Sequence, residues 1–521
     1  MTGSAHPANP SPDGVRWATP QGRWLLAATV LGSGLVFLDA TSSNVALPAI
    51  EDDLGAGVAG LQWTINAYTL ALASLILLGG SLSDRFGRRR IFLVGTVWFA
   101  LASLACGVAP STAALVGARA LQGVGGALLT PGSLAILQAC FASTDRARAV
   151  GAWSGLSGIA AAAGPLVGGW LVEVWTWRLI FLSNLPVAAV VVIVAVRHVP
   201  EPDRPAAEGH LDAVGALLGA LGLGLTTWSL IEFGEAGPSP STWLAAVAGL
   251  VAIAAFLVTQ ARRPHPLLPL EVFASRQFVG VNLVTLAVYA ALSGVFFLLF
   301  LQLQQVLGYS PTHAGAAALP VTGLLLVLSA RAGALSQRIG PRVPMTVGPL
   351  LFGVGALLLT RVEAGVGYVG GVLPAVLVLG LGLALTVAPL TATALAAVSP
   401  ELVGVASGVN NTVARIGGLL AVATLPPLAG ISGAALGDPV AFSAGFRIAM
   451  IITAGVAASG AVLAWLLVRN EGQAGPPPDV VPAPSRSHCP VAGPPVVIRT
   501  GVALPPPRGG GGSAPGPGDR A

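Results

Sequence analysis

Two charged residues, Asp39 and Arg119, lie inside long apolar stretches of the chain. A charge at the centre of a bilayer costs about 2.5–3.5 kcal/mol on insertion scales, so such residues usually mark ion or proton pathways. A low dielectric and a nearby cation shift the pKa of a carboxyl group in opposite directions, so a modest rearrangement could load and release a proton at Asp39. The alternatives are a purely structural carboxylate and an arginine that only donates to backbone carbonyls.

A charged loop follows the second apolar stretch and contains Asp84, Arg85, Gly87, Arg88 and Arg89. The glycine permits a tight turn between two helices, and an aspartate at a helix end can pair with arginines of a neighbouring loop. We interpret this motif as a gate that holds one end of the molecule shut in one conformation. The alternative is that the arginines only fix the topology in the membrane. That explanation covers some arginines but neither the aspartate nor the glycine spacing.

A third pattern, Gly164, Pro165, Gly168 and Gly169, lies within one apolar stretch. Proline removes a backbone hydrogen bond and kinks a helix, and the glycines allow a second helix to approach closely. Close packing alone would explain the same residues, so the pattern by itself assigns no function.

Several polar residues in or beside apolar stretches are candidates for lining a substrate cavity: Asn44, Asn66, Tyr68, Gln122, Asn411 and Arg415. Arg415 has three possible explanations. It meets a carboxylate from the other half of the chain, it binds an anionic group of the substrate, or it lies near a helix end that is wrongly placed. A membrane-embedded carboxylate at Asp39 favours cationic or neutral lipophilic substrates, and Arg415 argues the other way.

These residues must be positioned by membrane helices, because the chain is 54% hydrophobic and only 9% charged. Soluble proteins carry about 25% charged residues. A membrane-spanning helix needs about 20 predominantly apolar residues. Fourteen stretches meet this criterion: 24–46, 61–82, 91–109, 112–134, 148–171, 179–197, 211–231, 243–260, 278–303, 312–331, 344–361, 367–395, 404–428 and 443–468. Asp39 and Arg119 each lie about seven residues from one end of their stretch, which is about 10 Å below the same membrane surface.

The arginines gather in alternate loops, as the positive-inside rule requires of the cytoplasmic side. The clusters Arg85–Arg90 and Arg146–Arg148 fall on the same side because two predicted helices separate them. We therefore expect a multi-pass protein of the plasma (inner) membrane with both termini in the cytoplasm.

The sequence shows no arrangement of residues typical of a catalytic site. All 26 basic residues are arginine, which excludes a Walker-type phosphate loop because that loop needs a lysine. The three cysteines, Cys106, Cys140 and Cys489, and the six histidines show neither a disulfide framework nor metal-ligand spacing. We expect no enzyme activity, no cofactor, no metal and no nucleic-acid partner. Any uphill transport would draw on an ion gradient or a separate subunit.

The loop motif occurs twice. Residues 80–89 read GSLSDRFGRR, and residues 333–342 read GALSQRIGPR. Each copy follows the second helix of a six-helix set, which indicates two related halves with a two-helix hairpin between them. The predicted divisions are an N-terminal tail (1–22), a first half (23–200), a linker with two helices (201–262), a second half (263–469) and a disordered, proline- and glycine-rich tail (470–521).

The chain resembles the major facilitator superfamily, and within it the fourteen-span drug:proton antiporters. Five motifs carry the resemblance, in residues 38–48 (LDATSSNVALP), 80–90 (the first loop copy), 119–125 (RALQGVG), 164–169 (GPLVGG) and 177–186 (WRLIFLSNLP). It covers roughly residues 24–468. It implies an all-α integral membrane fold of two six-helix halves plus an inserted two-helix hairpin, with fourteen transmembrane helices. It also implies proton coupling at Asp39, and a glycine–proline pattern typical of exporters.

Two positions depart from the family pattern. Ser43 stands where valine is usual, and Gln337 takes the place of the acidic residue in the second loop copy, so we expect the gate's charges in the first half. The sequence thus predicts proton-coupled efflux of small lipophilic molecules, such as drugs, antibiotics or metabolites, by a monomer that uses alternating access. The alternatives are an uncoupled facilitator, an importer, and a membrane receptor that transports nothing.

Overall fold

A computed structural model describes residues 14–201, 212–263 and 266–470. The predicted C-terminal tail lies outside the described residues from 471 onward, as do residues 1–13 of the predicted N-terminal tail. The described residues form helices and connecting loops, with a single backbone bridge between Val15 and Phe141.

Thirteen segments of the described chain are long and apolar enough to cross a membrane. They are α1 (Pro20–Val45), α3 (Gly57–Phe86), α4 (Arg88–Gly107), α5 (Thr112–Cys140), α6 (Ser143–Val174), α7 with α8 (Arg178–Leu182, Asn184–His198), α9 (Ala213–Ala236), α10 (Pro240–Arg262), α11 (Arg276–Leu301), α12 with α13 (Pro311–Ala317, Leu319–Ile339), α14 (Arg342–Leu359), α15 (Leu373–Ala396) and α18 (Pro439–Leu467). Two short helices, α2 (Leu47–Leu54) and α17 (Gly433–Leu436), lie between them.

The predicted stretch 404–428 is helix α16 (Val403–Leu428). Its 26 residues are enough to span a bilayer. Asn410, Asn411 and Arg415 lower its hydropathy, so it is not among the thirteen apolar segments. The predicted all-α membrane fold is confirmed, with α16 as the fourteenth long helix.

Local sequence sets where these helices begin and end. Thr19 caps α1, where its hydroxyl accepts the N–H of Gly22 and Pro20 occupies the first turn. Ser111 caps α5 in the same way. Gly55 ends α2 in the left-handed conformation, with φ of +59°.

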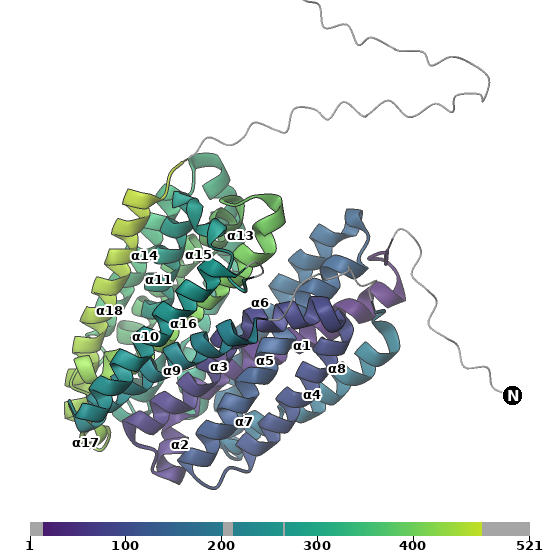
Figure 1. Cartoon of the computed structure of the whole chain (residues 1–521). Coiled ribbons are helices and arrows are strands. Elements are labelled where there is room, and N and C mark those ends of the chain that lie inside the picture. Colours follow the sequence, from purple (N-terminus) through teal and green to yellow (C-terminus); the bar gives the residue numbers. More distant parts are fainter. Residues whose placement is uncertain (1–13, 202–211, 264–265, 471–521) are drawn as a thin grey trace, which may run out of the picture. The chain divides into compact units, whose positions relative to one another are not determined.

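The same packing pattern occurs in both halves of the chain. In the first half α1 packs against α6 and α8, and α5 packs against α3 and α4. In the second half α11 packs against α16 and α18, and α15 packs against α13 and α14. Figure 1 shows the two groups by colour, purple to blue for α1–α8 and teal to yellow for α11–α18. The helices of the sequence repeat therefore occupy equivalent places in two bundles, while α9 and α10 pack on each other and α9 contacts α3 and α16.

The two loop copies are also alike in backbone conformation. Gly87 and Gly340 have φ of +106° and +85°, a region that glycine adopts readily and other residues do not. A Cβ on Gly87 would collide with the carboxyl group of Glu201, and one on Gly340 with the side chain of Asn470. Glu201 and Asn470 each follow the last helix of their own half. We call the end of the bundle where these two loops lie the arginine-rich end.

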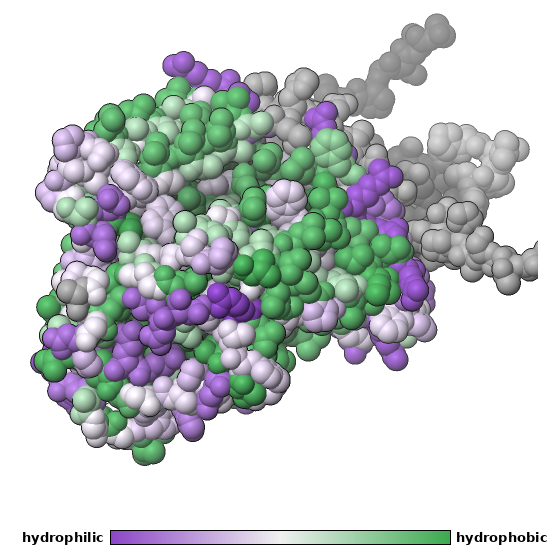
Figure 2. Space-filling view, turned by 90° about the horizontal axis from the view of Figure 1, so that it is seen from below, coloured by the Kyte–Doolittle hydropathy of each residue, from purple (hydrophilic) through white to green (hydrophobic). Residues whose placement is uncertain are grey.

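The outside of the bundle is apolar. Trp98, Trp170, Trp175, Trp243 and Trp465 each expose more than 40% of their surface. Figure 2 shows hydrophobic residues in green over much of the visible face, interrupted by purple hydrophilic patches. A surface of this kind suits contact with lipid, where tryptophan is favoured near the interfaces.

Hydrogen bonds join the two halves at the end opposite the arginine-rich end. The Gln62 side chain at the start of α3 donates to the backbone oxygen of Val422 in α16 at 2.6 Å. Glu173, at the end of α6, accepts from the hydroxyl of Ser310 at 2.7 Å. The side chain of Gln304 donates to the last carbonyl of α1 at 2.9 Å. The structure is thus closed at this end.

Candidate functional site

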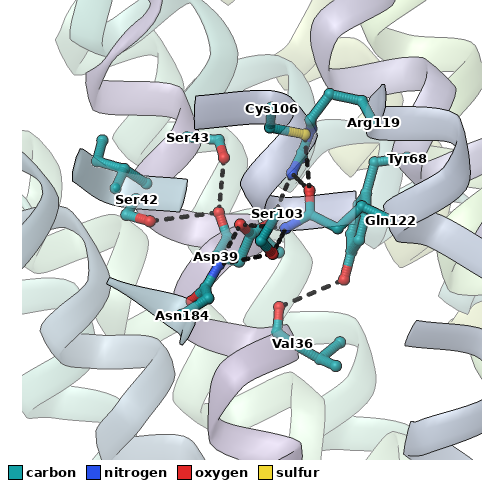
Figure 3. Close-up of polar contacts among 12 residues, drawn as sticks. Val36, Asp39, Ser42, Ser43, Tyr68, Ser103, Cys106, Arg119, Gln122 and Asn184 are labelled. Carbon is teal, nitrogen blue, oxygen red and sulfur yellow. Dashed lines mark hydrogen bonds and ion pairs between the residues drawn. The ribbon is translucent and has the colours of Figure 1, made fainter. Parts of the chain in front are cut away.

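Asp39 lies at the centre of a buried polar cluster contributed by α1, α4, α5 and α8 (Figure 3). Arg119 Nη1 lies 2.5 Å from Asp39 Oδ2, so the two residues form an ion pair. Asp39 Oδ1 accepts hydrogen bonds from Gln122 Nε2 at 2.8 Å and from Asn184 Nδ2 at 3.1 Å. Both amides also donate to the hydroxyl of Ser103, at 2.8 and 3.3 Å.

The local sequence explains how these side chains meet. Arg119 and Gln122 are three residues apart in α5, so they share one face of the helix. Gly125 allows close packing of α5 on α4, because a Cβ there would lie 2.7 Å from the backbone nitrogen of Phe99. Asn184 is the first residue of α8, directly after the turn that separates it from α7.

Arg119 is enclosed on every side by the first half. Its Nε donates to the backbone oxygen of Thr64 at 3.0 Å, and its guanidinium lies 4.4 Å from the ring centre of Tyr68 and 5.4 Å from that of Phe181. Arg119 is 1% exposed and Asp39 is 0% exposed. A pair this well satisfied is stable in a low dielectric, whereas either charge alone is not. Protonation of Asp39 would therefore loosen its hold on Arg119.

Three residues of this cluster were not predicted as site residues. Asn184 lies in one of the sequence motifs, where a polar residue within an apolar stretch is a usable signal. Ser103 and Phe181 carry no such signal, because small hydroxyls and phenylalanines are common in membrane helices.

The predicted cavity residues do not form one group. Tyr68 and Gln122 belong to the cluster around Asp39, where the Tyr68 ring covers Arg119. Asn44 donates to a backbone oxygen of its own helix at 3.2 Å.

The other three predicted cavity residues lie on α3 and α16. Asn66 is fully buried in α3, and among the described residues neither polar atom of its amide has a hydrogen-bond partner. Asn411 is exposed on α16 and Arg415 is partly exposed, one turn further along the same helix. These three residues remain candidates for a substrate site.

The predicted gate residues interact within the first half. Asp84 Oδ1 lies 3.1 Å from Arg88 Nη2, and Arg88 also donates to a backbone oxygen of α5. Arg89 donates to a backbone oxygen of α8 at 2.6 Å. The guanidinium of Arg85 lies 5.9 Å from the ring centre of Phe86. These interactions fasten the loop to α4, α5 and α8.

The Gly164, Pro165, Gly168 and Gly169 pattern brings α6 against two different helices. Gly164 and Gly168 face α1, and a Cβ on Gly168 would lie 2.6 Å from a Ser42 side chain atom. Gly169 faces the first turn of α12, in the other half, with no room for a Cβ. Close packing of helices is therefore one function of all three glycines.

A separate ion pair joins α2 to α7 near the closed end. Asp53 Oδ2 lies 2.5 Å from Arg178 Nη1 and accepts from Trp177 Nε1 at 3.0 Å. The hydrogen bond from Arg178, followed by the one from Trp177, holds the pKa of Asp53 below its ordinary value.

This ion pair makes stability depend on pH. A carboxyl group whose pKa is lower in the folded state stabilises the fold above its unfolded pKa, and that stabilisation is lost as the pH falls through the folded pKa. We expect Asp53→Asn to lower the thermal midpoint slightly at neutral pH, and the difference from wild type to vanish as the pH falls below the ordinary value of 3.8. A difference that is unchanged at acid pH would show that Asp53 acts through packing alone.

The fold consists of two related six-helix bundles and an added helix pair, and one bundle encloses a buried ion pair. This is the architecture of transporters built from two helical bundles. The chain belongs to the Major Facilitator Superfamily, whose sequence model matches residues 29–422. The family membership predicted from the sequence motifs is confirmed.

Curated relatives include resistance and export proteins. The chain is 37% identical over 476 residues to the puromycin resistance protein pur8 of Streptomyces alboniger, covering 89% of this chain and 93% of that protein. It is 35% identical over 426 residues to the tetracenomycin C resistance and export protein of Streptomyces glaucescens, covering 81% and 78%. A solved structure of a bacterial homologue of the human lysosomal transporter Spinster, inward-facing and occupied, aligns with a TM-score of 0.63. That alignment, at 19% identity, covers 87% of this chain and 98% of the other, and it shows the fold alone.

Proposed function

We propose that the protein exports small molecules across the plasma membrane in exchange for protons. The observation that carries this proposal is the buried Asp39–Arg119 ion pair, a protonatable group between α1 and α5 in the half that bears all five sequence motifs. The names of the relatives support export, because they describe proteins of antibiotic resistance and export. We further propose that the protein works as a monomer and catalyses no reaction.

The arginine-rich end faces the cytoplasm on this proposal, as the positive-inside rule requires. The structure then corresponds to the inward-facing conformation, in which Asp39 has given up its proton and holds Arg119. Substrate enters from the cytoplasm, the two halves rotate, and substrate leaves outside. A proton then binds Asp39, weakens its attraction for Arg119, and lets α1 and α5 shift so that the inward-facing conformation returns.

The gate and the glycine-rich helix have complementary roles in this cycle. The loop of Asp84 and Arg85 holds the arginine-rich end shut in the outward-facing conformation. The glycines of α6 allow close packing on α1 and on α12 in the inward-facing one. α6 touches both the helix that carries Asp39 and the opposite half, so it can pass a change at Asp39 to the interface.

Inverted membrane vesicles with an acidic interior test the proposal. We expect a panel of lipophilic compounds to contain members that accumulate inside and that release protons as they do so. Vesicles without the protein are the control. Equilibration without accumulation, at the same rate with and without the pH gradient, would favour an uncoupled facilitator. Gradient-driven loss from the vesicles would favour an importer, and specific binding with no flux would favour a receptor.

A further inference from the structure

Arg415 is a membrane arginine that has no hydrogen-bond or ion-pair partner among the described residues. It lies near the middle of α16, which runs from Val403 to Leu428, so a misplaced helix end does not explain it. Within the described residues, no hydrogen bond or ion pair reaches its guanidinium, and its side chain is partly exposed. An uncompensated charge at this depth is costly. No group among the described residues balances it.

The neighbouring helices offer no carboxylate at the level of Arg415. Helices α11, α15 and α18 carry no acidic residue, and α3 and α9 carry theirs only near one end, at Asp84, Glu232 and Glu235. Asp39 is engaged by Arg119 at 2.5 Å and by two amides. Of the possible explanations for Arg415, an anionic group on the substrate is the one that the structure leaves.

Arg415 lies on the face of α16 that points to α3, between the two halves. Gly408, Arg415 and Val422 are seven residues apart, so they share a helix face. A Cβ on Gly408 would lie 2.6 Å from the Leu77 side chain of α3, and the carbonyl of Val422 accepts from Gln62 of α3 at 2.6 Å.

Asn66 provides a second unpaired polar group on the facing helix. It lies on the same side of α3 as Gln62, one turn further along. It is 0% exposed, and its amide nitrogen and amide oxygen have no hydrogen-bond partner in the part of the chain that the structure describes. Because α3 and α16 run antiparallel between their two contact points, Asn66 and Arg415 lie within about one helical turn of the same level.

We propose that Arg415 and Asn66 form a subsite for an anionic group, a carboxylate or an ionised enol or phenol, on an amphipathic substrate. This inference rests on the proposed transport function and names its substrate class. A guanidinium presents paired N–H donors to a planar anion, and an amide adds a further donor. The ion pair at Asp39 is neutral as a whole, so the charge of Arg415 is the one that such a substrate would balance.

Three pyrene compounds with one apolar body test the subsite: 1-pyrenebutyrate, its methyl ester and 1-pyrenebutylamine. Binding to the full-length protein in lipid nanodiscs is measured by fluorescence anisotropy at neutral pH. We expect wild type to bind the anion most tightly. Arg415→Gln should weaken binding of the anion about tenfold or more, and change binding of the ester and the amine little. Arg415→Lys should retain part of the preference for the anion, and Asn66→Ala should weaken binding of the anion severalfold.

The control is Arg361→Gln, the same change at an exposed loop arginine. Removal of an unpaired charge should leave the thermal midpoint of Arg415→Gln unchanged or higher, whereas a structural role would lower it. Equal binding of the anion by Arg415→Gln and wild type would overturn the proposal. The proposal would also be overturned if the wild-type protein bound the amine or the ester more tightly than the anion, or if it did not bind the anion.

Uptake of the same compounds into inverted vesicles separates this inference from the transport function. Charge-selective binding without gradient-driven uptake would support the subsite and contradict proton-coupled export. Gradient-driven uptake without charge selectivity would support export and contradict the subsite.

Discussion

Replacing Asp39 with asparagine will destabilise the protein and abolish proton-driven transport. The substitution keeps the size of the side chain but leaves Arg119, which is 1% exposed, without its counterion. Breaking a buried ion pair from one side costs about 3–5 kcal/mol. Arg119 retains Thr64 O and Gln122 Oε1 as acceptors, so we expect a loss near the lower end, about 3 kcal/mol. The loss in the free energy of unfolding is measured on the purified wild-type and variant proteins in nanodiscs.

A double-mutant cycle separates the structural role of the pair from its role in coupling. Arg119→Gln leaves Asp39 as a buried carboxylate whose ion-pair partner is missing, and should be as destabilising as Asp39→Asn. The double variant Asp39→Asn/Arg119→Gln removes both charges and should recover most of the lost stability. It should still fail to couple transport to protons. A double variant that pumps like wild type would show that the pair is only structural.

Gly315→Val will prevent closure of the end opposite the arginine-rich end. Gly315 of α12 packs directly on the backbone carbonyl of Pro165 in α6, and a Cβ would collide with it. The atoms in contact belong to the backbones of α6 and α12, and backbone atoms cannot move aside as the end of a flexible side chain can. Overpacking costs about 1–3 kcal/mol, which shifts the ratio of two conformations about 5–150-fold. We expect a protein that folds, favours the open form at this end and transports at least about fivefold more slowly.

Cysteine labelling reports which conformation the variant adopts. Ser310 lies in the closed interface, where its hydroxyl donates to Glu173. In a background with the native cysteines replaced by serine, Ser310→Cys should react with a membrane-impermeant maleimide faster when Gly315→Val is present. Gly323→Val is the matched control, since nothing lies within 4 Å of a Cβ there. Equal labelling with and without Gly315→Val would contradict the packing argument.

The sequence predicted the membrane helices and the equal depth of Asp39 and Arg119 because both follow from simple geometry. Apolar stretches of bilayer length become helices, and two charges at equal depth have strong reason to pair. Ser103 and Asn184 could not be chosen in advance, because many small polar residues lie in these helices and only packing decides which of them converge.

Cavity residues were harder to predict because depth alone does not tell which way a side chain points. Asn66 and Tyr68 are two residues apart in α3, and such residues do not share a helix face. Tyr68 accordingly covers Arg119, while Asn66 lies on the side toward α16. Three explanations for Arg415 remained open until the structure showed the length of α16 and showed that the described helices beside it carry no carboxylate at the level of Arg415.

Proton movement in proteoliposomes, for wild type and Asp39→Asn, tests the central claim most directly. Two assays run side by side on one transported compound: uptake driven by an imposed pH gradient, and exchange of labelled for unlabelled compound with no gradient. The control variant is Asp438→Asn, which preserves a cap at the start of α18. We predict that wild type and Asp438→Asn show both activities and release protons with the compound, while Asp39→Asn retains exchange and loses gradient-driven uptake. Gradient-driven uptake by Asp39→Asn at the wild-type rate would contradict the account and place the coupling proton elsewhere.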